Sequence, residues 1–216
     1  MRTISDIYSE YTIMPNLALH QLRVAAVAKH ILDALKIHNR SVISACLLHD
    51  MGNMIKFRLT DFPEFLEPQG LEYWEKVKSA MVEKYGAEEH LATVRIAEEI
   101  GISEETMACL NAVGFTKTIQ NLQAPLAHKI CAYADMRVGP KGVLTLQERF
   151  DDGRKRYANR TDRTLLEVEK LEALYVAGFE LEKQIFEGLA LKPEEITDSR
   201  IEQEVETLKE WEIETT

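Results

Sequence analysis

The chain has 216 residues, with 26 Lys and Arg against 36 Asp and Glu, and its formal net charge is −10 at pH 7. That charge argues against general affinity for nucleic-acid backbones or anionic lipid surfaces. Hydrophobic residues make up 45% of the chain, enough for an ordinary core, and no apolar run approaches the ~18 residues that span a bilayer. The three cysteines form no CxxC pair, and the N-terminus lacks a secretory pattern, so we expect a cytoplasmic protein that binds neither nucleic acid nor membrane.

Apolar residues recur at steps of three and four along most of the chain, which predicts an all-α fold. The first long helix is expected from Pro15 to about Ile37, and the second from Val42 to Asp50. Residues 58–70 carry two prolines and a glycine and predict a loop. Further helices are expected over residues 71–85, 87–100 (closed by Gly101), 103–113 (capped by Ser103) and 122–138.

The C-terminal third is also predicted to be helical. Residues 139–142 (GPKG) break the preceding helix, and Thr145 with Glu148 can form a capping box for the next one. A long amphipathic helix is expected over 163–189, and Pro193 opens a final acidic helix that we expect to be loosely attached. The sequence thus predicts a main domain over residues 1–160 and a C-terminal helical extension over 161–216, which packs on the domain or on a second subunit.

Basic residues gather in one part of this acidic chain. Residues 137–163 contain eight basic and four acidic side chains, a local net charge of +4. A small anionic ligand could face this segment, or it could be a solvated helix face with intrahelical ion pairs. Arg149, Arg156, Arg160 and Arg163 fall at helical spacing, and we assign none of them to catalysis.

Four ionisable side chains stand at positions where the helical period predicts core: His20, His49, Asp50 and Asp135. Burying one such group unpaired costs several kcal/mol, whereas four that converge on one cation satisfy one another. Two imidazoles and two carboxylates form a mixed nitrogen and oxygen site, suited to one divalent ion of Mn, Fe, Co, Ni, Zn or Mg.

The order His, His-Asp, Asp on a helical chain resembles the HD superfamily of metal-dependent phosphohydrolases. Its segments here are LALHQLRVAAVAKHI, ACLLHDMGN and ICAYADMRVG, within residues 15 to 150. The resemblance implies an HD-domain-like helical bundle whose metal ligands are the four residues above. It also implies hydrolysis of a nucleotide or another small phosphorylated metabolite by a metal-activated water. Asn53 stands where many members have a lysine, and residues 108–115 contain no histidine for a second metal, which favours one ion over two.

The resemblance also suggests catalytic roles. Asp50 or Asp135 could orient the attacking water, in addition to binding the ion. His90 could stabilise the transferred charge or bind a metal or phosphate, and the alternative is a surface histidine. His30, His38 and His128 are expected to be structural or exposed.

Three cations are candidates for substrate binding. Arg23 lies one helical turn after His20 and shares its face, where it could bind phosphate or form a buried ion pair. Lys84 could also stabilise the transferred charge, and Arg137, two residues after Asp135, could reach the same cavity.

Other functions fit the same residues. One alternative is a non-catalytic nucleotide sensor, and another is a helical interaction protein whose metal is structural. A third is an oxygenase, which would need two irons. The expected partner is a small phosphorylated substrate, and the C-terminal helices could form a homo-oligomer.

Overall fold

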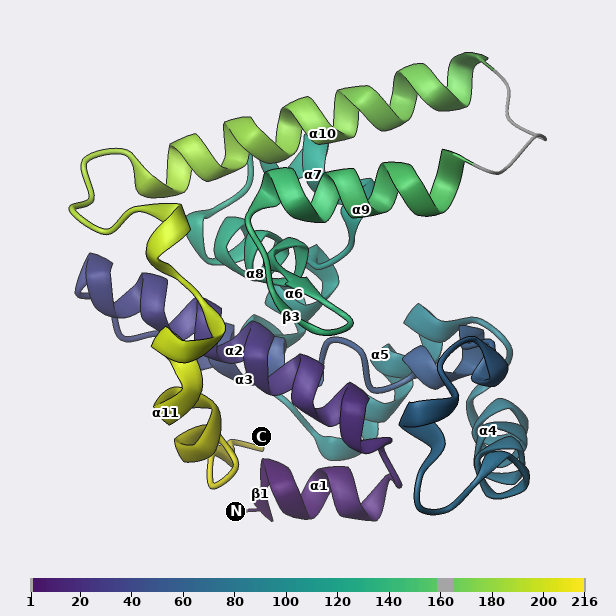
Figure 1. Ribbon diagram of the computed structural model, residues 1–216. Coiled ribbons are helices and arrows are strands. Elements are labelled where there is room, and N and C mark those ends of the chain that lie inside the picture. The colour runs from purple at the N-terminus through teal and green to yellow at the C-terminus, as the bar shows by residue number, and fades with distance from the viewer. Residues whose placement is uncertain (1, 159–164, 216) are drawn as a thin grey trace.

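Helices form most of the computed structural model, which describes residues 2–158 and 165–215 (Figure 1). Within these ranges, strands are limited to short pieces of two residues each. The prediction of an all-α helical bundle is therefore confirmed. None of the helices in the described ranges combines the length and the apolar character needed to cross a membrane.

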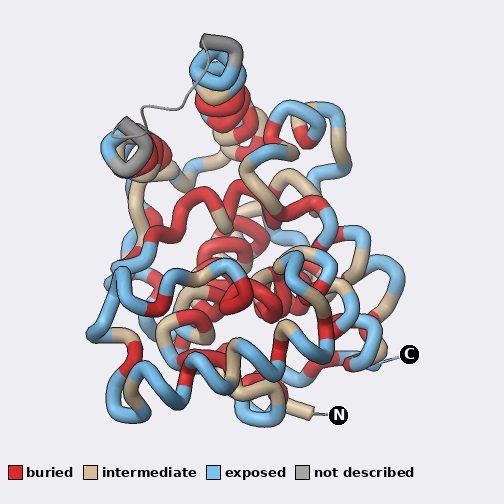
Figure 2. Tube along the Cα trace, turned by 90° about the vertical axis from the view of Figure 1, so that its right-hand side faces the viewer, coloured by how far each residue is buried: buried red, intermediate tan, exposed pale blue. Residues whose placement is uncertain are grey.

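The central helices are α2 (Pro15–Leu35), α3 (Arg40–Leu48), α6 (Glu104–Ala112) and α8 (Leu126–Arg137), which pack on one another. Figure 2 shows that buried residues gather in the middle of the molecule and that exposed residues lie mostly on its outer segments. All seven residues from Val42 to Leu48 are buried, which explains why the second helix lacks a polar face.

Local signals set the ends of these helices. Lys36 adopts the left-handed conformation with φ of 57° and ends α2, two residues before the predicted limit. The side chain of Asn39 accepts a hydrogen bond from the Val42 amide and begins α3. The Ser103 side chain accepts one from the Thr106 amide, which confirms the predicted cap of α6.

The region between α3 and α6 forms one side of the molecule, on the right of Figure 1. The predicted loop contains the short 3-10 turns η1 (Asn53–Lys56), η2 (Leu59–Asp61) and η3 (Pro63–Leu66). Helix α4 (Leu71–Tyr85) has the predicted bounds, and α5 (Glu89–Ile100) begins two residues later than predicted.

The helix expected over 122–138 is shorter in the structure, because α8 begins four residues later, at Leu126. After the turn η4 (Phe115–Lys117), a short helix α7 (Thr118–Asn121) precedes α8, which begins after Pro125. Because proline lacks an amide N–H and restricts the residue before it, the helix cannot continue through this point.

The break at 139–142 is a hairpin. Strand β2 (Val138–Gly139) pairs antiparallel with β3 (Gly142–Val143). The Thr145 hydroxyl and amide donate to the Glu148 carboxylate, and the Glu148 amide donates back to the Thr145 hydroxyl. The predicted capping box is therefore confirmed at the start of α9 (Leu146–Ala158).

The C-terminal helices pack on the rest of the chain. Helix α10 (Leu165–Phe186) contacts α7, α8 and α9 (Figure 1). The turn η5 (Pro193–Glu195) leads to α11 (Asp198–Leu208), whose buried Ile201, Val205 and Leu208 pack it on α2. The expectation that this last helix is loosely attached is wrong, because its apolar face is buried.

The two ends of the described chain meet. Strand β1 (Arg2–Thr3) pairs antiparallel with β4 (Glu212–Ile213), beside α1 (Ile4–Glu10). The predicted boundary between residues 160 and 161 lies outside the described residues, as do Arg160 and Arg163.

Candidate metal centre

Three packed helices bring the four predicted ligands together. His20 lies in α2, His49 and Asp50 follow the last residue of α3, and Asp135 lies near the end of α8. Each pair of these helices is in contact. Residues separated by up to 115 positions in the sequence therefore meet because the helices that carry them form one core.

The ligand atoms of His20, His49 and Asp50 all lie within 4.8 Å of one another. Asp50 Oδ2 lies 3.6 Å from His20 Nε2 and 3.7 Å from His49 Nε2. The ring centroids of the two histidines are 5.3 Å apart. This arrangement can hold a metal ion, as the sequence predicts.

Asp135 closes the other side of the cluster. Its Oδ1 lies 3.3 Å from His20 Nε2 and 3.3 Å from His49 Nε2. Both imidazoles therefore present Nε2 to carboxylate oxygens. Nε2 is also the atom that each imidazole would offer to a cation.

His49 is held in one orientation. Its Nδ1 donates to the Cys46 carbonyl oxygen at 2.8 Å, which leaves Nε2 as the nitrogen free to bind a metal. The side chain is 1% exposed, and Nε2 has no well-oriented hydrogen bond within the described part of the chain. Because a buried nitrogen rarely lacks a partner, this atom fits a ligand to an ion.

Two neutral side chains fix Asp50. The Asn53 side-chain amide donates to Asp50 Oδ2 at 2.6 Å. The Asp50 amide donates to Gln21 Oε1 at 3.1 Å, which ties the end of α3 to α2. Sequence reasoning gave neither Gln21 nor Asn53 a role. The available signal was their position in the sequence, because Gln21 follows His20 and Asn53 lies three residues after Asp50.

Charge compensates for burial at this centre. Burial lowers the pKa of His49, but the carboxylates of Asp50 and Asp135 and the Cys46 carbonyl raise it to a net value of about 9. Burial raises the pKa of Asp135, but its close contacts and charge interactions with His20 and His49 hold that pKa well below its usual range. The two imidazoles and the carboxylates therefore stabilise one another in the metal-free protein.

The centre is partly exposed to solvent. The side chains of His20, Asp50 and Asp135 are 18%, 22% and 26% exposed. A small ligand can therefore reach the side chains of these three residues.

The three predicted substrate-binding cations have partners within the chain. Arg23 Nε lies 3.0 Å from Asp198 Oδ1, an ion pair that ties α2 to the start of α11. Lys84 Nζ lies 2.8 Å from Glu99 Oε1, and the Lys84 side chain is 58% exposed. Arg137 is 1% exposed and donates to the Tyr133 hydroxyl and to the carbonyl oxygens of Leu144 and Ile196. These contacts hold Arg137 in the fold, between α8, the hairpin and η5.

His90 lies in the first turn of α5, which packs against the turn after Asp50. The Gly52 amide donates to Thr93 Oγ1 at 2.9 Å across this contact. His90 Nε2 lies 3.4 Å from Lys117 Nζ. The sequence carried no signal for Lys117, because this residue ends the short turn η4 and no motif surrounds it.

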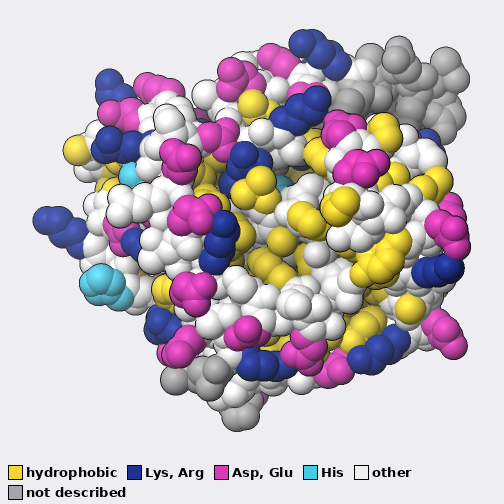
Figure 3. Space-filling model, turned by 60° about the horizontal axis from the view of Figure 1, so that its bottom comes forward, with side chains coloured by type: hydrophobic (Ala, Val, Ile, Leu, Met, Phe, Trp, Pro, Cys, Tyr) yellow, Lys and Arg dark blue, Asp and Glu magenta, His cyan; other side chains and the backbone are white. Residues whose placement is uncertain are grey.

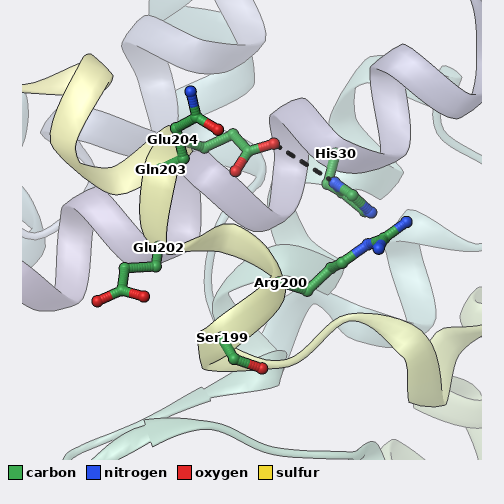
Figure 4. Close-up of a pocket in the computed structure, with 6 residues that line it drawn as sticks. All are labelled: His30, Ser199, Arg200, Glu202, Gln203 and Glu204. Atoms are coloured by element: carbon green, nitrogen blue, oxygen red, sulfur yellow. Dashed lines mark ion pairs between the residues drawn. The ribbon is translucent and has the colours of Figure 1, made fainter.

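Two surface cavities in the described residues are lined by other side chains. One, of about 420 Å³, lies between α2 and α11, where His30 Nδ1 is 3.7 Å from Glu204 Oε1 (Figure 4). The other, of about 800 Å³, runs along α4 and η2. On the face shown in Figure 3, hydrophobic side chains gather near the centre, and acidic and basic side chains are intermixed around them.

No family model, no curated protein and no solved structure matches this chain. In its described residues, the chain is an all-α protein with a cluster of histidine and aspartate side chains that can hold a metal ion.

Proposed function

We propose that this protein is a metal-dependent phosphohydrolase that acts on a nucleotide or another small phosphorylated metabolite. One divalent ion would be held by His20, His49, Asp50 and Asp135. The observation that carries the proposal is the buried Nε2 of His49, which lacks a well-oriented hydrogen bond within the described residues and faces both carboxylates.

The donor atoms favour a catalytic ion over a purely structural one. Two nitrogen and two carboxylate ligands suit Mn, Fe, Co, Ni, Zn or Mg. Closed structural zinc sites are commonly built from cysteine or cysteine and histidine, and the three cysteines here are buried and free. When bound, a divalent ion lowers the pKa of water and draws charge from phosphoryl oxygens.

The carboxylates would orient the reacting groups. Asn53 holds Asp50 Oδ2 toward the two histidines, and Asp135 Oδ1 faces them from the other side. Either carboxylate can accept a hydrogen bond from the attacking water and hold it in line with a phosphoryl group. The choice of phosphoryl transfer, as opposed to another metal-assisted hydrolysis, rests on the residue order that resembles HD phosphohydrolases.

The test begins with elemental analysis of protein purified without added metal. A phosphate-release screen follows, over mononucleotides, cyclic nucleotides and small phosphorylated metabolites, with Mn, Co, Ni or Mg added back. We expect about one ion per chain and metal-dependent phosphate release. Asp50→Ala should lose both while keeping its helical circular dichroism.

The matched control is Asp33→Ala. Asp33 is also an aspartate of the central helices, but its side chain is 48% exposed and pairs with Lys29 in α2. This variant should keep the ion and the activity. A chain that holds its ion and releases no phosphate from any compound would contradict the proposal and favour a sensor or a structural metal. Two irons per chain would favour an oxygenase.

A further inference from the structure

Lys117 is a cation with neutral partners. Its Nζ donates to the Asn111 carbonyl oxygen at 2.6 Å and lies 3.4 Å from His90 Nε2. Because an ammonium group has no acceptor, His90 Nε2 must be the acceptor in this contact. In the described ranges, no carboxylate lies within ion-pair distance of Lys117. One of its three N–H donors therefore remains available to a ligand.

Partial burial makes this charge costly. Desolvation lowers the pKa of Lys117, and the negative charge of Glu88 opposes that effect only in part. Arg23 and Lys84, in contrast, each have a carboxylate partner. Lys117 thus lacks the internal compensation that these two cations have, and an anionic ligand would supply it.

On the His90 side, the pair is anchored to the turn that carries Asp50. The Thr93 hydroxyl accepts from the Gly52 amide and donates to the Glu89 carbonyl oxygen at 3.0 Å. A Cβ added at Gly52 would lie 2.5 Å from that same Glu89 oxygen. The first turn of α5 therefore lies directly against the turn after Asp50.

On the Lys117 side, the pair is anchored near Asp135. Thr118 follows Lys117 and is buried, and its hydroxyl donates to the Phe115 carbonyl oxygen at 2.6 Å. The same hydroxyl contacts Met136 Sδ at 3.6 Å, and Met136 follows Asp135. The pair of Lys117 and His90 thus joins an element packed beside Asp50 to an element packed beside Asp135.

We propose that Lys117 binds the phosphoryl group of a phosphate monoester at the metal centre, and that His90 is a positioning residue for its ammonium group. This inference rests on the proposed function and names its substrate class. The carboxylates of Asp50 and Asp135 balance a divalent ion, so Lys117 adds one uncompensated positive charge. A monoester phosphate brings about −2 at most, whereas a triphosphate brings more charge than these groups balance.

The experiment measures binding of inorganic phosphate to the manganese-loaded chain by titration calorimetry. Lys117→Met keeps the aliphatic stem and removes the charge, and it should weaken phosphate binding about tenfold or more. Lys117→Arg should restore much of the affinity, since it keeps a cationic donor. The control Lys76→Met removes an exposed lysine that pairs with Glu72 in α4, and it should bind phosphate like the wild type.

His90 is tested by rescue. His90→Ala should weaken phosphate binding by a smaller factor than Lys117→Met, and His90→Gln, which keeps a side-chain acceptor, should recover part of the loss. Manganese content and helical circular dichroism should be unchanged in every variant. A role of His90 in folding alone would change those two measurements and leave phosphate affinity intact, which would overturn its assignment.

The outcomes separate this inference from the hydrolase proposal. Equal phosphate affinity in the wild type and Lys117→Met, at equal manganese content, would overturn the inference even if the chain hydrolyses monoesters. Failure of the manganese-loaded wild type to bind phosphate would overturn it too. Phosphate binding that depends on Lys117, in a chain that hydrolyses nothing, would support the phosphate site and contradict the hydrolase.

Discussion

Gly52 lies where the turn after Asp50 meets α5, and the substitution Gly52→Ala tests that contact. A Cβ at this position would lie 2.5 Å from the Glu89 carbonyl oxygen, 2.7 Å from Ala92 Cβ and 2.7 Å from the Thr93 amide nitrogen. The backbone of Gly52, with φ of −92° and ψ of 0°, is open to alanine. The cost must therefore come from contact with α5, where two of the three atoms belong to the backbone and cannot rotate away.

Relief of this contact requires α5 to move away from the turn. Overpacking of this kind costs about 1–3 kcal/mol, and weakening the hydrogen bond from the Gly52 amide to Thr93 adds about 1 kcal/mol. We expect Gly52→Ala to lower the free energy of unfolding by about 2–4 kcal/mol. For a chain of this size, the melting temperature should fall by on the order of 10 °C. Metal affinity should fall with it, because Asp50 lies two residues away.

Thermal and urea unfolding of the metal-free protein measure this effect. Gly188→Ala is the control, because nothing lies within 4 Å of its Cβ position and only its positive φ of 76° opposes alanine. That strain costs roughly 1 kcal/mol. If Gly52→Ala costs no more than Gly188→Ala, the packing of α5 against the metal-centre turn is wrong.

Three further outcomes are expected. Arg137→Met should lower the free energy of unfolding by about 2–4 kcal/mol in urea titrations, because it leaves buried oxygens without donors, and an unchanged value would contradict its structural role. Burial, together with the charge of Glu99, raises the pKa of Tyr11 from 10.0 to about 12. The folded state thus holds this proton more tightly than the unfolded chain, so the resulting stability is complete below pH 10 and is lost as the pH rises toward 12. Tyr11→Phe should reduce the fall in stability over that range in urea unfolding at pH 9 and pH 11.5, and an unchanged fall would refute the assignment. Finally, manganese at one hundred times its dissociation constant should raise the free energy of unfolding by about 2.7 kcal/mol, and a melting temperature unaffected by a chelator would contradict the metal site.

Part of the candidate site was predictable from the sequence because its residues break a local pattern. His20, His49 and Asp135 interrupt helices that are otherwise apolar, and an ionisable group in such a position needs a partner. The structure brings these residues together with Asp50, and it confirms that His20, His49 and Asp50 can hold a metal ion. Their proposed chemistry stays a prediction.

The cations could not be assigned in this way. Arg23 lies one turn after His20, and Arg137 lies two residues after Asp135. A linear sequence cannot show that their partners lie at the start of α11 and just after the hairpin and η5. Asp198 is 175 residues away from Arg23 in the chain, and Ile196 is 59 residues away from Arg137. Arginine reaches its partner through a long side chain, so the fold decides which carboxylate or carbonyl it meets.

The sequence by itself determined the helices, because the apolar period, the Ser103 and Thr145 caps and the proline and glycine breaks act over a few residues. Only the tertiary structure decided that α11 packs on α2 and that Lys117 meets His90. Those contacts join segments that are distant along the chain, and their free energy depends on which surfaces are buried together. Local propensity carries no information about that choice, because the same amphipathic face of α11 could be covered by this chain or by another one.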